Sequence, residues 1–344
     1  LIGCKIVKSR TCEIAKAREE VKTAPSVASK PHPSPYGRAS SVMMGRQDYT
    51  SVLLRLVGME LYKLRRRLMS KVLSIIAILA MIGLFALIAG GAMYLARNGA
   101  TLAEIAGYSQ SLRLPSSLYL VTQLLNTVGL ILLIILVSTI VGGEYVDKTV
   151  RLMLTRGPTR TQFLFAKVGA TIVCIVLGVV GLTLLGIFTG LLLNFFTGVA
   201  QNFDFFTPDW FGHLLLYLLV TMLGLFVYAM MALCLSTLGR ATAAGMAGVL
   251  TWSFVVEPLV EVGSSFGRDV SGPVGGFFQA LPDYLIGTNV GQLQQDQSHY
   301  VYVSAIIQPS AMQANLHSLL VLAVYLVIFI GLSWWVSVRR DVII

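Results

Sequence analysis

The sequence carries few charged side chains. Only 12% of its 344 residues are Asp, Glu, Lys or Arg, whereas soluble domains contain about 25%. Hydrophobic residues make up 56% of the chain, and the mean hydropathy is +0.76. So little charge cannot cover the surface of a water-soluble globule of this size. The composition therefore excludes a soluble enzyme and a disordered protein, and it predicts a membrane protein.

Residues that support chemistry are also scarce. The four cysteines and four histidines have neither disulfide-framework nor zinc spacing. The sequence lacks the phosphate-binding motif G-x-x-x-x-G-K-[ST], the metalloprotease motif H-E-x-x-H and the nucleophile motif G-x-S-x-G. We therefore expect no catalytic residue and no metal site in this chain.

Long apolar runs are what the sequence does contain. A membrane-spanning helix needs about 20 apolar residues, and six runs approach or exceed that length: 72–95, 118–141, 164–193, 214–238, 241–262 and 318–338. These runs predict an all-α membrane protein with six transmembrane helices. The fifth is the weakest, because Glu257 precedes Pro258 and a residue before proline disfavours helix. We expect this helix to kink or end there, and five spans plus a re-entrant hairpin is the alternative.

Two segments precede the first span. Residues 1–48 are basic and rich in Pro and Ser, which predicts a disordered tail. The chain does not begin with Met, so a mis-assigned start is the alternative. Residues 49–71 are amphipathic and predict a helix lying in the membrane interface, with a simple charged flank as the alternative. Its apolar stripe comprises Leu53, Val57, Leu61, Leu64 and Leu68, and Arg55, Lys63 and Arg66 lie on the opposite face.

The basic residues predict the orientation. Of the 26 Lys and Arg residues, 23 fall on one side if the amino terminus is cytoplasmic. Cytoplasmic loops carry the excess of Lys and Arg, so both termini are expected in the cytoplasm. This distribution also explains the net charge of +10 without a nucleic-acid partner.

The loop over 142–167 is the most informative segment. It reads GGEYVDKTVRLMLTRGPTRTQFLFAK, and residues 144–156 can form a short helix. Gly157 and Pro158 then break the pattern, and Thr159 is expected to cap the next helix. The spacing alone favours a simple connector that follows the positive-inside rule.

The same loop resembles the signature region of the ATP-binding-cassette (ABC) type-2 permeases, the membrane subunits of many bacterial exporters. The matching residues are Gly143-Glu144-Tyr145, Thr149, Arg151-Leu152, Leu154-Thr155-Arg156-Gly157, Arg160 and Lys167. Three further segments resemble the family in the same order: its elbow helix at 59–67, its fifth-span ending at 254–261 and its outer segment at 281–287. The resemblance covers about residues 50–340, and the tail before Gln47 departs from it.

The resemblance implies a type-2 permease domain over 49–344 in a bacterial plasma membrane, with 142–167 as its coupling loop. Six residues would face a separate ABC ATPase, which would hold the ATP and Mg: Glu144, Tyr145, Thr149, Arg151, Arg156 and Arg160. A second permease subunit, identical or different, and membrane lipids would be the other partners. The alternatives are a structural or assembly subunit of a larger membrane complex and a membrane enzyme that uses the region of Glu257.

Three polar residues adjoin or interrupt the apolar runs. Gln123 and Asn126 lie near the start of the second run, and Glu257 follows the fifth. Polar and charged side chains are costly in lipid and usually have a function there, so these residues are candidates for a translocation path. Hydrogen bonds between helices are the alternative for Gln123 and Asn126, and relief of the backbone break at Pro258 is the alternative for Glu257. The scarcity of buried charge points to a hydrophobic or amphipathic substrate.

The longest external segment is expected at 263–317. Within it, the stretch VGGFFQALPDYLIG at 274–287 can form a short helix at the membrane surface.

Overall fold

The computed structural model of the chain describes residues 49–99, 101, 107, 111–146, 159–197, 203, 205–267, 272–302 and 315–339. The chain divides into two compact units, Leu1–Asp48 and Tyr49–Ile344, and all described residues belong to the second. The tail predicted over 1–48 lies outside the described residues. Every secondary-structure element in the described part is a helix, which confirms the all-α prediction.

Six helices in the described part are long and apolar enough to cross a membrane, as predicted. These six indicate a multi-pass membrane protein. Their bounds are Leu68–Arg97 (α3), Ser117–Val146, Arg160–Thr197 (α8), Pro208–Gly239 (α9), Thr242–Gly267 and Asn315–Arg339 (α14). The second consists of α5 (Ser117–Leu124), the π-helix η1 (Leu125–Gly129) and α6 (Leu130–Val146).

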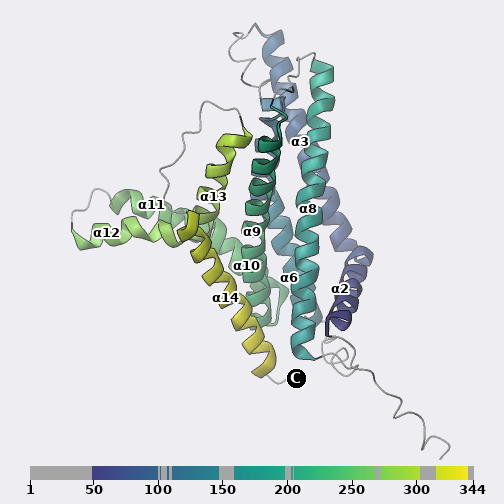
Figure 1. Cartoon of the computed structure of the whole chain (residues 1–344), viewed down its shortest axis with the longest axis vertical. Coiled ribbons are helices and arrows are strands. Elements are labelled where there is room, and N and C mark those ends of the chain that lie inside the picture. Colours follow the sequence, from purple (N-terminus) through teal and green to yellow (C-terminus); the bar gives the residue numbers. More distant parts are fainter. Residues whose placement is uncertain are drawn as a thin grey trace, which may run out of the picture. The chain divides into compact units, whose positions relative to one another are not determined.

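Helix α9 is the centre of the bundle. It contacts α6, α8, α10, α13 and α14, and Figure 1 shows neighbouring helices along its length. Buried residues form 61% of its most apolar 18-residue stretch, against 17% in α3 and in α14. The sequence Thr-Pro-Asp at 207–209 fixes its start, because the Thr207 hydroxyl accepts a hydrogen bond from the Trp210 amide at 3.2 Å. The outer helices therefore keep most of their apolar surface exposed.

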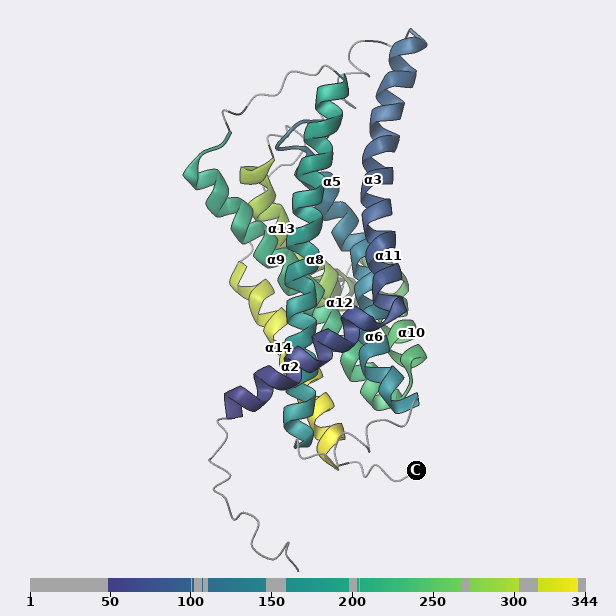
Figure 2. The same cartoon turned by 90° about the vertical axis from the view of Figure 1, so that its right-hand side faces the viewer.

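The amphipathic segment forms α2, which spans Tyr49–Arg66 and crosses α8 near one end of that helix (Figure 2). Leu61 and Leu64 of the predicted stripe join the core. The predicted end at residue 71 is wrong, because Arg67 is extended (φ −73°, ψ 130°) and α3 begins at Leu68. This break changes the helical phase, so Leu68 is 77% exposed and does not continue the stripe.

The predicted loop over 142–167 is partly helical at both ends. Glu144 and Tyr145 belong to the last turn of α6, which ends at Val146, so a new helix starting at Glu144 was wrong. Residues 147–158 lie outside the described residues. The cap expected at Thr159 is confirmed. Its hydroxyl accepts from the Gln162 amide at 3.3 Å, and the Gln162 side chain accepts from the Thr159 amide at 3.0 Å.

The fifth run forms α10 (Thr242–Thr251), the π-helix η2 (Trp252–Val256) and α11 (Glu257–Gly267). The helix does not end at Pro258. The π-helical turn lies immediately before Glu257, where a proline removes one backbone donor and favours a kink. Figure 1 shows α11 running across the direction of α9, beside α12 (Pro273–Ala280).

The segment over 263–317, which was expected to be external, contains more helix than predicted. The expected short helix is confirmed as α12 followed by the 3-10 turn η3 (Leu281–Tyr284). A further helix, α13 (Ile286–Val301), was not predicted. It packs against α9 and α14, and its buried residues Ile286, Val290 and Leu293 follow helical spacing. Its Gln-rich remainder gives it too little hydropathy to be recognised as a membrane run.

Candidate functional site

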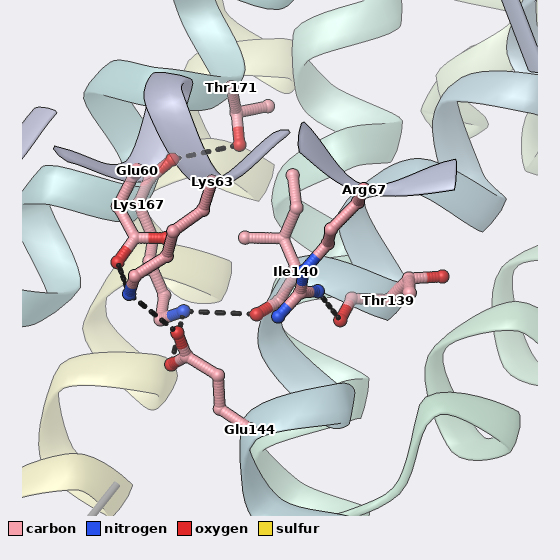
Figure 3. A network of polar contacts seen from close by, with 8 residues as sticks. All are labelled: Glu60, Lys63, Arg67, Thr139, Ile140, Glu144, Lys167 and Thr171. Atoms are coloured by element: carbon pink, nitrogen blue, oxygen red, sulfur yellow. Dashed lines mark hydrogen bonds and ion pairs between the residues drawn. The ribbon is translucent and has the colours of Figure 1, made fainter. Parts of the chain in front are cut away.

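Four charged side chains meet where α2, α6 and α8 come together. We call Glu60, Lys63, Glu144 and Lys167 the ion-pair cluster (Figure 3). Lys63 Nζ lies 2.8 Å from Glu60 Oε1 and 3.3 Å from Glu144 Oε1. Lys167 Nζ lies 2.7 Å from Glu144 Oε2. The Glu144 carboxylate therefore joins α2 to α8 through two lysines.

The ion-pair cluster is buried and formally neutral. Glu60, Glu144 and Lys167 are each 3% exposed, and the Lys63 side chain is 23% exposed. Removing one member of a buried ion pair costs about 3–5 kcal/mol, because its partner stays buried and uncompensated. The cluster therefore requires α2, α6 and α8 to keep this arrangement.

Two cations also bind the carboxyl-terminal part of α6. Lys167 Nζ donates to the Ile140 carbonyl at 3.0 Å, and Arg67 Nη1 donates to the Thr139 carbonyl at 3.3 Å (Figure 3). Positive charge is favourable at this end of a helix. Arg67 is the extended residue between α2 and α3, so the α2–α3 junction is also hydrogen-bonded to α6.

Sequence reasoning missed this cluster. Lys63 was expected on the face opposite the apolar stripe, but it is half-buried and points to Glu144. The available signal was Glu60, which lies three residues after Val57 and four before Leu64, in register with the stripe. A lone carboxylate on the buried face of a helix requires a cation, and Lys63 and Lys167 supply the positive charge of the cluster.

The predicted ATPase-facing residues have different surroundings. Glu144 is buried in the ion-pair cluster, and Tyr145 is half-buried against the core. Arg160 Nη1 donates to the carbonyls of Ser337 and Val338 at 3.4 and 3.2 Å, which ties the start of α8 to the end of α14. Three others lie outside the described residues: Thr149, Arg151 and Arg156.

Asn126 and Gln123 are separated by the structure. Asn126 lies in η1 and exchanges two hydrogen bonds with Gln294 of α13, at 2.9 and 3.3 Å. Gln294 also donates to the Thr221 hydroxyl of α9 at 3.0 Å. Asn126 thus makes the helix-to-helix bonds offered as its alternative role, whereas the Gln123 side chain is exposed.

Glu257 is 6% exposed and accepts three hydrogen bonds. The donors are the Tyr228 hydroxyl at 2.7 Å, the Trp252 indole at 2.8 Å and the Gly287 amide at 3.3 Å. The Gly287 amide lies in the first turn of α13, where a negative charge is favoured. A Cβ at Gly287 would clash with Glu257 Oε2, so a larger residue here would displace the carboxylate. Glu257 thus links α9, η2 and α13. Its described hydrogen bonds go to these elements, and not to the backbone at Pro258 that it was suggested to satisfy.

These contacts define what the described region can do. Among the described residues, no group of three or more His, Cys, Asp or Glu is placed to hold a metal ion. The helices on either side of residues 147–158 are joined to each other and to α2 and α14. A displacement of that segment would therefore reach four helices at once.

Comparison with known proteins gives one family. No curated protein matches the chain. Residues 109–343, more than half of the sequence, match the model of a family described as protein of unknown function (DUF2705). The match includes Asn126, Glu144, Lys167 and Glu257 but begins after α2. The chain belongs to the DUF2705 family.

Proposed function

We propose that this chain is the membrane-spanning permease subunit of an ABC transporter that exports a hydrophobic or amphipathic substrate. A separate ATPase subunit would bind and hydrolyse ATP, and a second permease subunit, identical or different, would complete the transporter. In this proposal the membrane is the bacterial plasma membrane, both termini are cytoplasmic, and the type-2 permease fold includes α2 as its elbow helix.

The observation that carries the proposal is the position of Glu144. Its buried carboxylate joins α2 to α8 at the end of α6, immediately before residues 147–158. A partner that pushes on this segment would move α6 and α8 together, and α2 with them. Rigid displacement of packed helices is an established route from ligand binding to a change of state.

The polar contacts in the spans support an apolar substrate. Glu144, Lys167 and Glu257 are engaged in ion pairs or hydrogen bonds within the chain. An inorganic ion or a strongly charged substrate would need free polar groups on its path. The loop between α6 and α8 is rich in Lys and Arg, and the positive-inside rule places such loops in the cytoplasm. This distribution of charge supports the proposed orientation.

The test is co-purification from host membranes. We expect the tagged full-length chain to bring down one ABC ATPase together with vanadate-sensitive ATP hydrolysis. Arg151→Glu combined with Arg156→Glu should abolish both, because these residues are proposed to contact the ATPase. Arg55→Glu, an exposed change on α2, is the matched control and should retain both.

Size-exclusion chromatography must show that the double variant remains monodisperse. An ATPase that still co-purifies with the folded double variant would contradict the proposed contact. Recovery of the intact wild-type chain without any ATPase would contradict the function.

A further inference from the structure

An apolar cavity of about 500 Å³ lies between α3, η1, α6 and α8. This volume falls within the range of about 300–1,000 Å³ found for small-molecule sites. Side chains that line it include Leu73, Leu133, Ile175 and Leu182. No charged side chain lines it, so its occupant must be apolar.

The polar side chains of the lining are already satisfied or weakly polar. The Ser70 hydroxyl donates to the Leu64 carbonyl at 2.7 Å, and the Ser74 hydroxyl donates to the Ser70 carbonyl at 2.9 Å. The thiol of Cys174 is the other polar group in the lining. Water needs two to four polar partners in a cavity, and these three are the only polar side chains among the lining residues.

The cavity opens sideways to the surface of the protein, between α3 and α8. Ser74 and Ile78 of α3 and Leu177 and Gly181 of α8 line it and are exposed. Both helices are candidate membrane spans, so the opening faces the side where lipid chains would lie. A Cβ at Gly178 or Gly181 meets no atom within 4 Å, which leaves open space along this face of α8.

Two basic residues adjoin lining residues of the cavity in the sequence. Leu64 and Ser70 line it, and they adjoin Arg65 and Lys71 in the sequence. Both basic side chains are exposed, and no residue in the described part of the chain forms an ion pair with either. Lys and Arg next to a membrane helix attract anionic lipid headgroups.

We propose that this cavity binds one acyl chain of an anionic phospholipid from the bilayer, with the lipid phosphate against Lys71 and Arg65. The chain enters between α3 and α8 and fills the space between α3, α6 and α8. Apolar lining, lateral opening and adjacent positive charge together specify this ligand. The inference does not depend on the proposed transport function.

Photo-crosslinking tests the proposal on the full-length protein in lipid nanodiscs. The probes are phosphatidylglycerol and phosphatidylcholine, each with a diazirine in one acyl chain. We expect crosslinks in residues 129–136 and 174–185, several-fold stronger from phosphatidylglycerol. Gly178→Phe should fill the cavity and reduce these crosslinks several-fold. Gly331→Phe on α14, where a Cβ also meets no atom within 4 Å, is the control and should leave them unchanged.

A second pair of substitutions tests the headgroup. Lys71→Gln with Arg65→Gln should remove the preference for phosphatidylglycerol while crosslinks from phosphatidylcholine persist. If Gly178→Phe is not monodisperse, Gly181→Leu takes its place. Crosslinks that are absent from both segments, undiminished by the filled cavity, or equal for the two lipids would overturn the proposal.

Discussion

Two of the buried glutamates, Glu144 and Glu257, are accommodated by opposite means. Glu144 is neutralised by the ammonium groups of Lys63 and Lys167. Glu257 has only neutral donors among its described hydrogen-bond partners: a phenol, an indole and a backbone amide. Loss of the Glu144 charge strands Lys167, because Lys63 keeps its ion pair with Glu60, whereas loss of the Glu257 charge strands no cation. The junction of α2, α6 and α8 is therefore held by charge, and the Glu257 region by hydrogen bonds.

The largest effect is expected at the ion-pair cluster. Glu144→Gln should lower the free energy of unfolding by about 3–5 kcal/mol, because Lys167 stays buried without its counter-charge. SDS-induced unfolding in mixed micelles measures the change. Adding Lys167→Met should recover part of the loss, because the stranded cation is removed. A loss below about 1 kcal/mol, or no recovery in the double variant, would show that the pair does not hold the helices.

Glu257→Gln should have a smaller effect than Glu144→Gln. Hydrogen bonds to a charged group contribute about 1.5–3 kcal/mol, and the amide keeps one acceptor for the Tyr228 or Trp252 donor. The same unfolding measurement compares the two variants directly, and Tyr228→Phe serves as the control that removes one donor. A loss equal to or greater than that of Glu144→Gln would remove the distinction between the two glutamates.

A weaker contact is expected between Asn126 and Gln294. Hydrogen bonds between membrane helices average about 0.6 kcal/mol and reach about 1.7 kcal/mol. We expect a coupling energy in this range from a double-mutant cycle of Asn126→Leu and Gln294→Leu. Zero coupling would mean that the reciprocal amide pair does not join η1 to α13.

Gln123→Leu should change least. Its side chain is exposed, and exposed substitutions usually stay within about 0.5 kcal/mol. It is the matched control for Asn126→Leu, three residues away in the same continuous helix. A larger loss of stability would indicate a contact for Gln123 beyond those of the described residues.

Hydropathy and local motifs predicted much of this molecule. Apolar runs located six helices, and the Gly-Pro break at 157–158 followed by Thr159 located the start of α8, because both signals lie within short stretches of sequence. The pairing of Glu144 with Lys63 could not be predicted in this way, because 81 residues separate them. Gln294 was missed for a related reason. It lies on α13, a polar helix, and its side chain becomes buried only when this helix packs against α9.

The loop between α6 and α8 provides the most direct test of the central claim. That claim is that this loop is cytoplasmic and binds an ATPase. Thr149→Cys, in a chain whose four cysteines are replaced by serine, would be labelled with a membrane-impermeant maleimide in oriented vesicles. The account predicts labelling in inside-out vesicles stripped of peripheral proteins, protection when the ATPase is bound, and none in right-side-out vesicles. Labelling from the outside would contradict it.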